Sequence, residues 1–399
     1  MSTRQRLLIY SHDSFGLGHI RRCRTIAHAL ATAYQNLEVL IVSGSPIIGS
    51  FEFKARVDFV KVPGLIKLRN GDYESLAKHR STDATTKLRA SVIGETALAF
   101  APDFFLVDKE PLGLRGELLG TLEKLKANGA RLILGIRDIL DAPDVLRAEW
   151  ERKRVYDSLR DLYDDIWIFG LKEIYEPLQG LPLDACVYPK MTYTGYLHRT
   201  VPQWGPPDQR PSEGPATPLL VTTGGGGDGA QLVSSVLGAY GAHGPDLPEA
   251  TIVLGPFMPM EEREMFLHQA NALKKLRLLT FDPRLESRLA EAQGVVAMGG
   301  YNTFCEILSF DRRAVILPRV EPRQEQLIRA QHASRLGLCR YLAPPPGTSP
   351  ASPDHVAEAI LNLSTQAPPS KAQIPGLLDG VRRVVQHFSA WMGPPDRSP

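Results

Sequence analysis

The feature that most constrains the fold is an alternation of short apolar runs with longer amphipathic stretches along most of the 399 residues. The apolar runs are rich in Leu, Ile, Val or Phe, and most of them end in Gly, Ser or Asp. Runs of this kind are typical of strands buried on both faces, and their alternation with helices predicts an α/β chain with parallel sheets. The expected strands are Arg6–Ser11, Leu37–Ser43, Val57–Val62, Phe104–Asp108, Arg131–Ile136 and Ile166–Gly170, followed by Leu219–Thr223, Ala250–Leu254, Leu276–Thr280, Val295–Met298 and Ala314–Pro318.

Three helices are expected between the strands of the first half. One runs from Arg21 to about Tyr34, and a second covers Leu114 to Asn128, with Gly129 in the position that a helix C-cap prefers. The third covers Pro143 to Asp161 and is heavily charged. We interpret this charge run as a solvated helix face, and contact with an anionic membrane surface is the alternative.

A proline-rich segment divides the chain. Residues 201–218 hold a run of prolines, glycines and polar residues that continues neither a helix nor a sheet. The sequence therefore predicts two Rossmann-like domains, residues 1–200 and 219–370, with a ligand cleft between their strand ends. A helix over 371–392 carries an apolar stripe that needs a partner, for which the first domain is one candidate. Residues 393–399 are expected to be a disordered tail.

The composition excludes several classes of protein. Lys and Arg total 46 against 44 for Asp and Glu, so a whole-chain basic footprint for nucleic acid is excluded. No apolar run approaches the roughly 20 residues that span a bilayer. The start of the chain has no apolar core of a signal peptide. The four cysteines are scattered, which argues against a disulfide framework or a zinc site and fits a reducing cytoplasm.

A short glycine-containing segment follows the first expected strand. Gly16 and Gly18 allow backbone amides to approach a ligand, and His19 comes directly after the second glycine. Neutral imidazole can take a proton from a hydroxyl, so we interpret His19 as a general base, with Asp13 or Asp108 as substitutes. The alternative is a helix start with an incidental surface histidine.

Two arginines lie near this segment in the sequence or follow a neighbouring strand. Arg21 is two residues after His19, and Arg137 directly follows the strand expected over Arg131–Ile136. Together with Gly16 and Gly18, these arginines predict that this side of the cleft, called the acceptor side below, favours an anionic group. Solvated or structural arginines are an equally good interpretation.

The second half begins with a strand, five glycines in six positions over Gly224–Gly229, and then a helix. Only glycine lets consecutive amides converge on a phosphate at a helix start. No Gly-Lys-Ser/Thr closes the loop, so it is not a P-loop. The segment predicts an anion cradle, with a ligand-free flexible loop as the alternative.

Three further segments of the second half contain candidate ligand-binding residues. Gly299 and Gly300 end a strand before a helix, whose early Glu306 could accept hydrogen bonds from ribose hydroxyls or merely offset the helix dipole. Another helix begins near Glu325 and Gln326, which could bind sugar hydroxyls. Phe281 could cover a nucleobase or lie in the core. The predicted donor-binding residues are Gly225, Gly226, Gly227, Phe281, Asp282, Gly299, Gly300, Tyr301, Asn302, Thr303, Glu306, Glu325 and Gln326.

These segments, in this order, resemble the donor half of GT-B glycosyltransferases of the MurG-like, family 28 group. The resemblance covers roughly residues 219–340. It implies Phe281 and the Asp282 backbone at uracil, and Gly299 and Gly300 at the diphosphate. It also implies that Glu306 binds the ribose and that Glu325 and Gln326 bind the donor sugar. Two residues depart from the family pattern: Gly227 stands where a serine is usual, and Glu325 replaces a glutamine.

The expected function is transfer of a sugar from a nucleotide diphosphate donor, with UDP implied by the resemblance, to a hydroxyl acceptor. The resemblance implies inversion at the anomeric carbon. Because no Asp-x-Asp motif is evident, no metal and no further cofactor are expected. The acceptor could be lipid-linked or anionic, which leaves peripheral membrane contact open. The alternatives are a UDP-sugar hydrolase or non-hydrolysing epimerase on the same fold, and a non-catalytic nucleotide-sugar binder.

Overall fold

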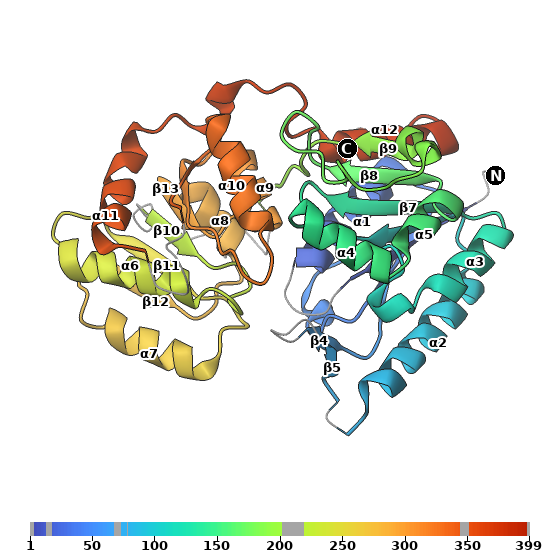
Figure 1. Ribbon diagram of the computed structural model, residues 1–399, viewed down its shortest axis with the longest axis horizontal. Coiled ribbons are helices and arrows are strands. Elements are labelled where there is room, and N and C mark those ends of the chain that lie inside the picture. Colours follow the sequence, from blue (N-terminus) through green and yellow to red (C-terminus); the bar gives the residue numbers. More distant parts are fainter. Residues whose placement is uncertain are drawn as a thin grey trace. The chain divides into compact units, whose positions relative to one another are not determined.

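The computed structural model describes residues 4–12, 18–67, 73–77, 79–201, 219–343 and 351–396. The chain forms two compact α/β units (Figure 1). The first unit comprises Met1–Leu197 together with Gly376–Pro399, and the second comprises His198–Pro375. The expected domains were 1–200 and 219–370. The segment that leads into the second unit, from His198, and the residues up to Pro375 therefore pack with that unit.

The first unit contains a parallel sheet with the strand order β3-β2-β1-β6-β7-β8-β9. Its strands are β1 (Gln5–Ser11), β2 (Leu37–Ser43), β3 (Val57–Lys61), β6 (Phe104–Asp108), β7 (Arg131–Arg137), β8 (Asp165–Phe169) and β9 (Met191–Tyr193). A separate antiparallel pair consists of β4 (Leu65–Lys67) and β5 (Tyr73–Ser75). The direction of strand addition reverses between β1 and β6, which makes this the topological switch point of the sheet.

Helices cover both faces of this sheet because right-handed crossovers run in opposite directions from the switch point. The helices are α1 (Gly18–Ala33), α2 (Thr82–Phe100), α3 (Leu119–Ala127), α4 (Pro143–Arg152), α5 (Val155–Asp161) and α12 (Gly380–Met392). Helix α2 packs on α3, and α12 packs on α1. Strand β6 is buried along its whole length, as expected for a strand covered on both faces.

The C-terminal helix returns to the first unit, as the fold prediction proposed. The Tyr34 hydroxyl donates a hydrogen bond of 3.0 Å to the Val385 carbonyl oxygen. The Phe388 ring lies 5.0 Å from Phe104, and Trp391 stacks at 5.5 Å on the same Phe104 ring. The apolar stripe that the sequence left without a partner is therefore buried against the sheet and α1.

The second unit repeats the design with the strand order β12-β11-β10-β13-β14-β15, all parallel. The strands are β10 (Leu219–Thr222), β11 (Ala250–Val253), β12 (Leu276–Leu279), β13 (Gly294–Ala297), β14 (Ala314–Ile316) and β15 (Arg340–Tyr341). The helices are α6 (Ala230–His243), α7 (Met260–Ala270), α8 (Leu285–Glu291), α9 (Tyr301–Ser309), α10 (Glu325–Arg335) and α11 (Pro353–Leu361). Helices α6 and α11 cover one face, and α9 and α10 cover the other (Figure 1). Its switch point lies between β10 and β13.

Several expected helix boundaries are wrong. Helix α1 begins at Gly18 rather than Arg21. The helix expected over Leu114–Asn128 is a 3-10 turn followed by α3, because Arg115 has a φ of 53°. The charged helix over Pro143–Asp161 is two helices, because Arg154 has a φ of 54°. A residue in the left-handed region interrupts the helical hydrogen bonds. Arginine has no special preference for this conformation, so the sequence does not indicate either interruption.

The expected layout of the C-terminal end also differs from the structure. The last helix begins at Gly380 rather than 371. Asp396, expected in a disordered tail, accepts a 2.8 Å hydrogen bond from the Gln35 amide. Most of the proline-rich linker, residues 202–218, and the last three residues lie outside the described part of the chain. Within the described residues, no helix is long and apolar enough to cross a membrane.

Candidate active site

In the first unit, the first turn of α1 meets the end of β6 at the switch point. His19 lies in the first turn of α1, and Asp108 is the last residue of β6. The His19 Nδ1 atom is 2.5 Å from Asp108 Oδ2. The sequence named both residues as candidate bases, and the structure brings them together as a pair.

The chemistry of this pair fixes the tautomer of the imidazole. Burial alone would raise the pKa of Asp108, but the charges of Arg22 and His19, and their hydrogen bonds, lower it. An ionised carboxylate only accepts hydrogen bonds, so Nδ1 of His19 carries the proton and donates it to Asp108. The lone pair of the neutral ring is then on Nε2, the nitrogen that can accept a proton.

His19 is held in its neutral form. Burial lowers the pKa of His19 to about 4; the charges of Arg22 and Lys109 also lower it, and Asp108 opposes them. The buried His12 ring, at the end of β1, meets the His19 ring edge-on at 5.4 Å. Burial likewise holds the pKa of His12 well below its usual value. Two neutral imidazoles therefore lie side by side at this edge.

The remaining residues predicted for the acceptor side lie close to this edge or outside the described residues. Gly18 begins α1, and Arg21 lies in its first turn. Arg137 ends β7, the strand next to β6. Asp13 and Gly16, the other two predicted residues, fall outside the described part of the chain.

In the second unit, the glycine-rich loop joins β10 to α6. Gly224 and Gly226 have φ values of 70° and 91°, which glycine adopts most readily. A Cβ on Gly226 would lie 2.3 Å from the Leu254 carbonyl oxygen, so the loop packs tightly on the end of β11. The Phe257 amide donates a 2.9 Å hydrogen bond to the Gly225 carbonyl oxygen. The loop is thus a built turn rather than a loose connection, and Gly227 continues it towards α6.

The neighbouring turn, between β13 and α9, is also built from glycines. Gly299 has a φ of 79°, and a Cβ there would meet the Ile316 side chain at 2.8 Å. Gly300, the N-cap of α9, has an ordinary φ of −58°, and a Cβ there would meet no atom within 4 Å. One side of the α9 N-terminus is therefore open.

Helix α9 carries four of the predicted donor residues. Tyr301, Asn302 and Thr303 form its first turn, and Glu306, fully buried, follows on the second. Partial positive charge at a helix N-terminus favours an anion there. The structure therefore places the glycines, the helix N-terminus and a buried carboxylate in one short element next to the β10 turn.

Phe281 and Asp282 follow β12 at the same edge of the sheet. Phe281 is 51% exposed, so the interpretation of this ring as a core residue is wrong. The Asp282 side chain accepts a 2.8 Å hydrogen bond from the Arg284 amide and pairs with Arg288. The carboxylate is therefore already paired with neighbouring residues. The backbone of Asp282 is the group that the resemblance assigned to the uracil base.

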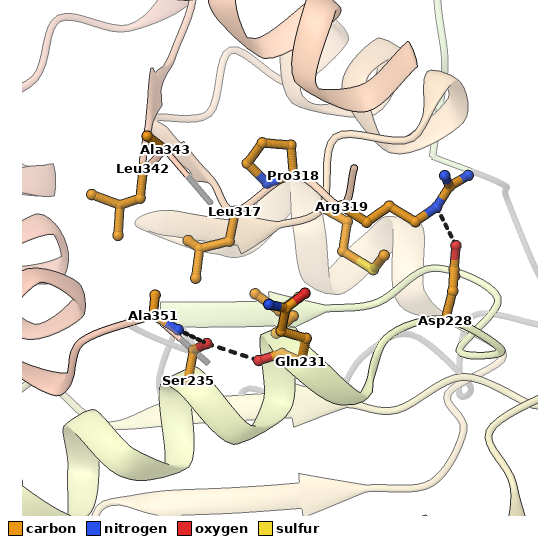
Figure 2. A pocket seen from close by; sticks show the side chains of 11 residues that line it. Asp228, Gln231, Ser235, Leu317, Pro318, Arg319, Leu342, Ala343 and Ala351 are labelled. Carbon is orange, nitrogen blue, oxygen red and sulfur yellow. Dashed lines mark hydrogen bonds and ion pairs between the residues drawn. The ribbon is translucent and has the colours of Figure 1, made fainter. Parts of the chain in front are cut away.

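Glu325 and Gln326 begin α10, and both contact Arg319 in the loop after β14. The Glu325 carboxylate accepts a 2.8 Å hydrogen bond from Arg319 Nη2, and the Gln326 side-chain oxygen accepts one of 3.2 Å from the Arg319 amide. Arg319 also pairs with Asp228 of the glycine-rich loop (Figure 2). The charge of Glu325, which departs from the family pattern, is thus balanced by Arg319.

A pocket lies beside this arginine, between the start of α6 and the ends of β14 and β15 (Figure 2). Its wall is mostly apolar, with Leu317 and Leu342 on one side, and Asp228 and Arg319 form a polar side. The side chains of Leu317 and Leu342 point towards the pocket in the close view. The pocket is lined by Arg319, the partner of Glu325, and its lining contains none of the predicted donor residues.

Three functional candidates in the second unit were missed by the sequence analysis, and all are arginines. Arg329 is 1% exposed and donates a 2.8 Å hydrogen bond to the Gly299 carbonyl oxygen. Arg199 donates one of 2.7 Å to the Asn302 side chain. With Arg319, they add positive charge around the two glycine turns. Arg329 follows Glu325 by one helical turn, a spacing that could have drawn attention to it. Arg199 precedes the proline-rich segment and gave no signal.

Residues 219–376 match the model of the glycosyltransferase family 28 C-terminal domain. The second unit is a domain of this kind. Together with the two-sheet architecture, the match supports a glycosyltransferase of the GT-B type. A search of curated proteins found no relative that matches it.

Solved structures share the fold over nearly the whole chain. MurG of Acinetobacter baumannii is 12% identical, with a TM-score of 0.59, and covers 97% of this chain and 99% of its own. A UDP-glucosyltransferase from Polygonum tinctorium is 12% identical, with a TM-score of 0.64 and coverages of 98% and 99%. The calicheamicin glycosyltransferase CalG4 is 16% identical, with a TM-score of 0.56 and coverages of 99% and 96%. At these identities the likeness shows the GT-B fold, as predicted.

Acidic and sulfur-containing residues do not gather into a metal cluster in the part of the chain that is described: no three His, Cys, Asp or Glu side chains are arranged to hold an ion.

Proposed function

We propose that this glycosyltransferase moves a sugar from a UDP-sugar to a hydroxyl group of its acceptor, with inversion at the anomeric carbon. The observation that carries the proposal is the pair of glycine turns at the β10–β13 switch point, each leading into a helix N-terminus. Backbone amides and helix dipoles arranged in this way stabilise the charge of a diphosphate without protein side chains.

The second unit supports the assignment of each part of the donor. The open side of Gly300 and the N-terminus of α9 would receive the diphosphate, with Glu306 on the ribose hydroxyls. The exposed Phe281 ring would cover the uracil. Arg199 donates a hydrogen bond to the Asn302 side chain and Arg329 donates one to the Gly299 carbonyl oxygen, so both add positive charge next to this element. Such charge is needed because the diphosphate becomes more negative as it leaves.

The first unit supports the assignment of the base. In the proposed step, the acceptor hydroxyl gives its proton to Nε2 of His19 while its oxygen attacks the anomeric carbon. The bond from that carbon to the β-phosphate oxygen breaks, and UDP departs with the bonding pair. Asp108 holds Nδ1 and stabilises the imidazolium that forms. Direct attack of this kind inverts the anomeric centre.

The sugar-binding part of the donor site is assigned to Glu325 and Gln326. Both side chains contact Arg319, so the arginine fixes their orientation rather than leaving a lone carboxylate next to the sugar. This pairing explains how Glu325 can stand where the family pattern has a glutamine. We propose that the acceptor has an anionic group near Arg21 and Arg137, and that the reaction needs no metal ion.

The experiment is a screen of nucleotide sugars by thermal shift, followed by turnover with and without acceptor alcohols. A ligand at 100 times its dissociation constant stabilises the folded protein by about 2.7 kcal/mol, which is readily measured. Stabilisation by UDP and its sugars, and no other nucleotide, is expected. Rapid release of free sugar or of an epimer without acceptor would instead indicate a hydrolase or epimerase.

The base is tested by His19→Gln. Turnover should fall by about 100- to 10,000-fold, because a general base contributes that much, while UDP binding stays as in the wild type. His28→Gln is the matched control: it removes another imidazole of α1, one whose Nε2 accepts a hydrogen bond from the Lys54 amide. Normal turnover in His19→Gln would remove His19 as the base.

A further inference from the structure

Arg22 is a buried arginine on α1, one helical turn after His19. Its side chain is 1% exposed. Its Nε donates to Asp108 Oδ1 and its Nη2 to Asp108 Oδ2, both at 2.7 Å. The planar guanidinium therefore binds both carboxylate oxygens in a fork, the geometry that a lysine cannot reproduce.

The two oxygens of Asp108 are thus shared between Arg22 and His19. Oδ2 accepts both from Arg22 Nη2 and from His19 Nδ1. The Nη2 atom lies 3.0 Å from Nδ1, but both atoms carry protons when Nδ1 donates to Asp108, so they do not bond to each other. With one partner fixed on each side, the carboxylate plane and the direction of the imidazole are determined.

The charges around His19 explain what the arginine adds beyond geometry. Asp108 alone would favour the imidazolium form of His19. Arg22 and Lys109, each a cation, oppose this, and His12 presents a neutral, buried ring. Nδ1 of His12 has no hydrogen-bond partner within the described residues. The carboxylate that acts most strongly on His12 is that of Glu110, which is paired with Lys153.

We propose that Arg22 is a positioning residue for the catalytic base, which holds Asp108 in one plane and offsets its charge so that His19 remains a neutral Nδ1–H tautomer with Nε2 free to take a proton. This inference rests on the proposed function, because it assigns a role around the base of that reaction. Arg22 touches Asp108 rather than the substrate, so its effect on the reaction passes through His19. This role accounts for the second arginine of the Gly18-His19-Ile20-Arg21-Arg22 segment, which is buried and therefore not a solvated surface residue.

Two substitutions separate charge from geometry. Arg22→Gln removes the cation and leaves Asp108 to act on His19 alone. The pKa of His19 should rise from about 4 towards its ordinary value. Arg22→Lys keeps a cation beside Asp108 but gives up the fork. This variant should keep the low pKa and lose the orientation. Arg24→Gln is the matched control, since Arg24 lies on the same helix with its guanidinium over the Phe51 ring at 4.9 Å.

The first measurement needs no activity. Histidine-selective ¹⁵N labelling of the full chain, with His19→Gln used to assign the signal, reports the tautomer and pKa of His19 by NMR. The expected results are a neutral Nδ1–H ring down to about pH 5 in the wild type and in Arg24→Gln, and an upward shift of at least one pH unit in Arg22→Gln. An unshifted His19 titration in folded Arg22→Gln, or a wild-type ring protonated on Nε2, would overturn the proposal.

The second measurement is the pH profile of kcat/KM for sugar transfer. In Arg22→Gln the acid limb should move upward with the NMR titration, and in Arg22→Lys the limb should stay while kcat falls by about 100-fold. The donor KM should change in neither. If the wild type transfers no sugar, the proposed function fails while the NMR result still decides the role of Arg22. If Arg22→Gln does not fold, Arg22→Lys decides it: wild-type kcat in that variant contradicts the positioning role.

Discussion

A single methyl group at Gly300 tests the donor site directly. Most glycines of the two turns cannot be used for this purpose. Gly226, for example, has a φ of 91° and would bring a Cβ to 2.3 Å from a carbonyl oxygen, so its replacement damages the fold. Gly300 has a φ of −58° and a ψ of 151°, and its Cβ would meet no atom within 4 Å. Gly300→Ala should therefore fold normally.

The magnitude follows from what would occupy that open space. If the diphosphate approaches the amides at the start of α9, the methyl group prevents at least one charge-assisted hydrogen bond. Such a bond contributes about 1.5–3 kcal/mol, which corresponds to roughly 10- to 150-fold in dissociation constant. The melting temperature should not fall, because alanine in an ordinary backbone conformation restricts the unfolded chain and adds about 0.4–1 kcal/mol of stability.

The assay is calorimetric titration of UDP into wild type, Gly300→Ala and Gly241→Ala. Gly241 is the matched control: it also has open space around its Cβ, and it lies near the far end of α6. At 1.5 Å per residue this is about 17 Å along the helix from the glycine-rich loop. The control should bind UDP as the wild type does. Wild-type affinity in Gly300→Ala, with an unchanged melting temperature, would show that the diphosphate does not bind at α9.

Three further predictions concern single side chains. Glu306→Gln should weaken UDP binding by about 1–3 kcal/mol and abolish any preference for UDP over 2′-deoxy-UDP, measured by calorimetry; a retained preference contradicts the ribose assignment. Arg319→Gln should lower both the melting temperature and the donor affinity, because it removes the cation that pairs with the buried Glu325 carboxylate, and adding Glu325→Gln should restore the melting temperature. Arg89→Met should lower the free energy of unfolding in urea by about 3–5 kcal/mol, since its carboxylate partner is fully buried, whereas Arg115→Met, at an exposed pair, should change it by less than about 1 kcal/mol; equal effects would contradict the burial argument.

Much of the fold could be predicted because the strands of both sheets are buried on both faces. A strand such as β6 reads Phe-Phe-Leu-Val-Asp, and the apolar run and its polar end are both visible without a structure. Helix α2 was missed. It spans Thr82–Phe100, and its buried residues include Thr85 and Arg89. A helix that buries polar side chains lacks the apolar stripe on which such predictions depend.

The predicted donor residues were accessible to sequence analysis for a similar local reason. Gly299, Gly300 and Glu306 belong to one strand–turn–helix element, so their spacing along the chain is close to their spacing in space. Arg199 acts on the same element from 103 residues away along the chain, through its hydrogen bond to Asn302. Nothing near Arg199 in the sequence indicates this partner, because the contact depends on how the segment before the linker packs.

The pairing of His19 with Asp108 shows where a sequence stops being sufficient. The two residues are 89 positions apart, and the described residues between β1 and β6 include four other strands. They meet because β6 joins the sheet on the free side of β1, a choice that the apolar pattern of β6 does not encode, since any neighbour would bury it equally well. Once β6 is next to β1, the polar residue at its end must face the first turn of α1, and the arginine one turn along that helix can reach the same carboxylate. Strand order therefore brings two candidate bases, His19 and Asp108, and the buried Arg22 into one hydrogen-bonded group, a geometry in which Asp108 can orient His19.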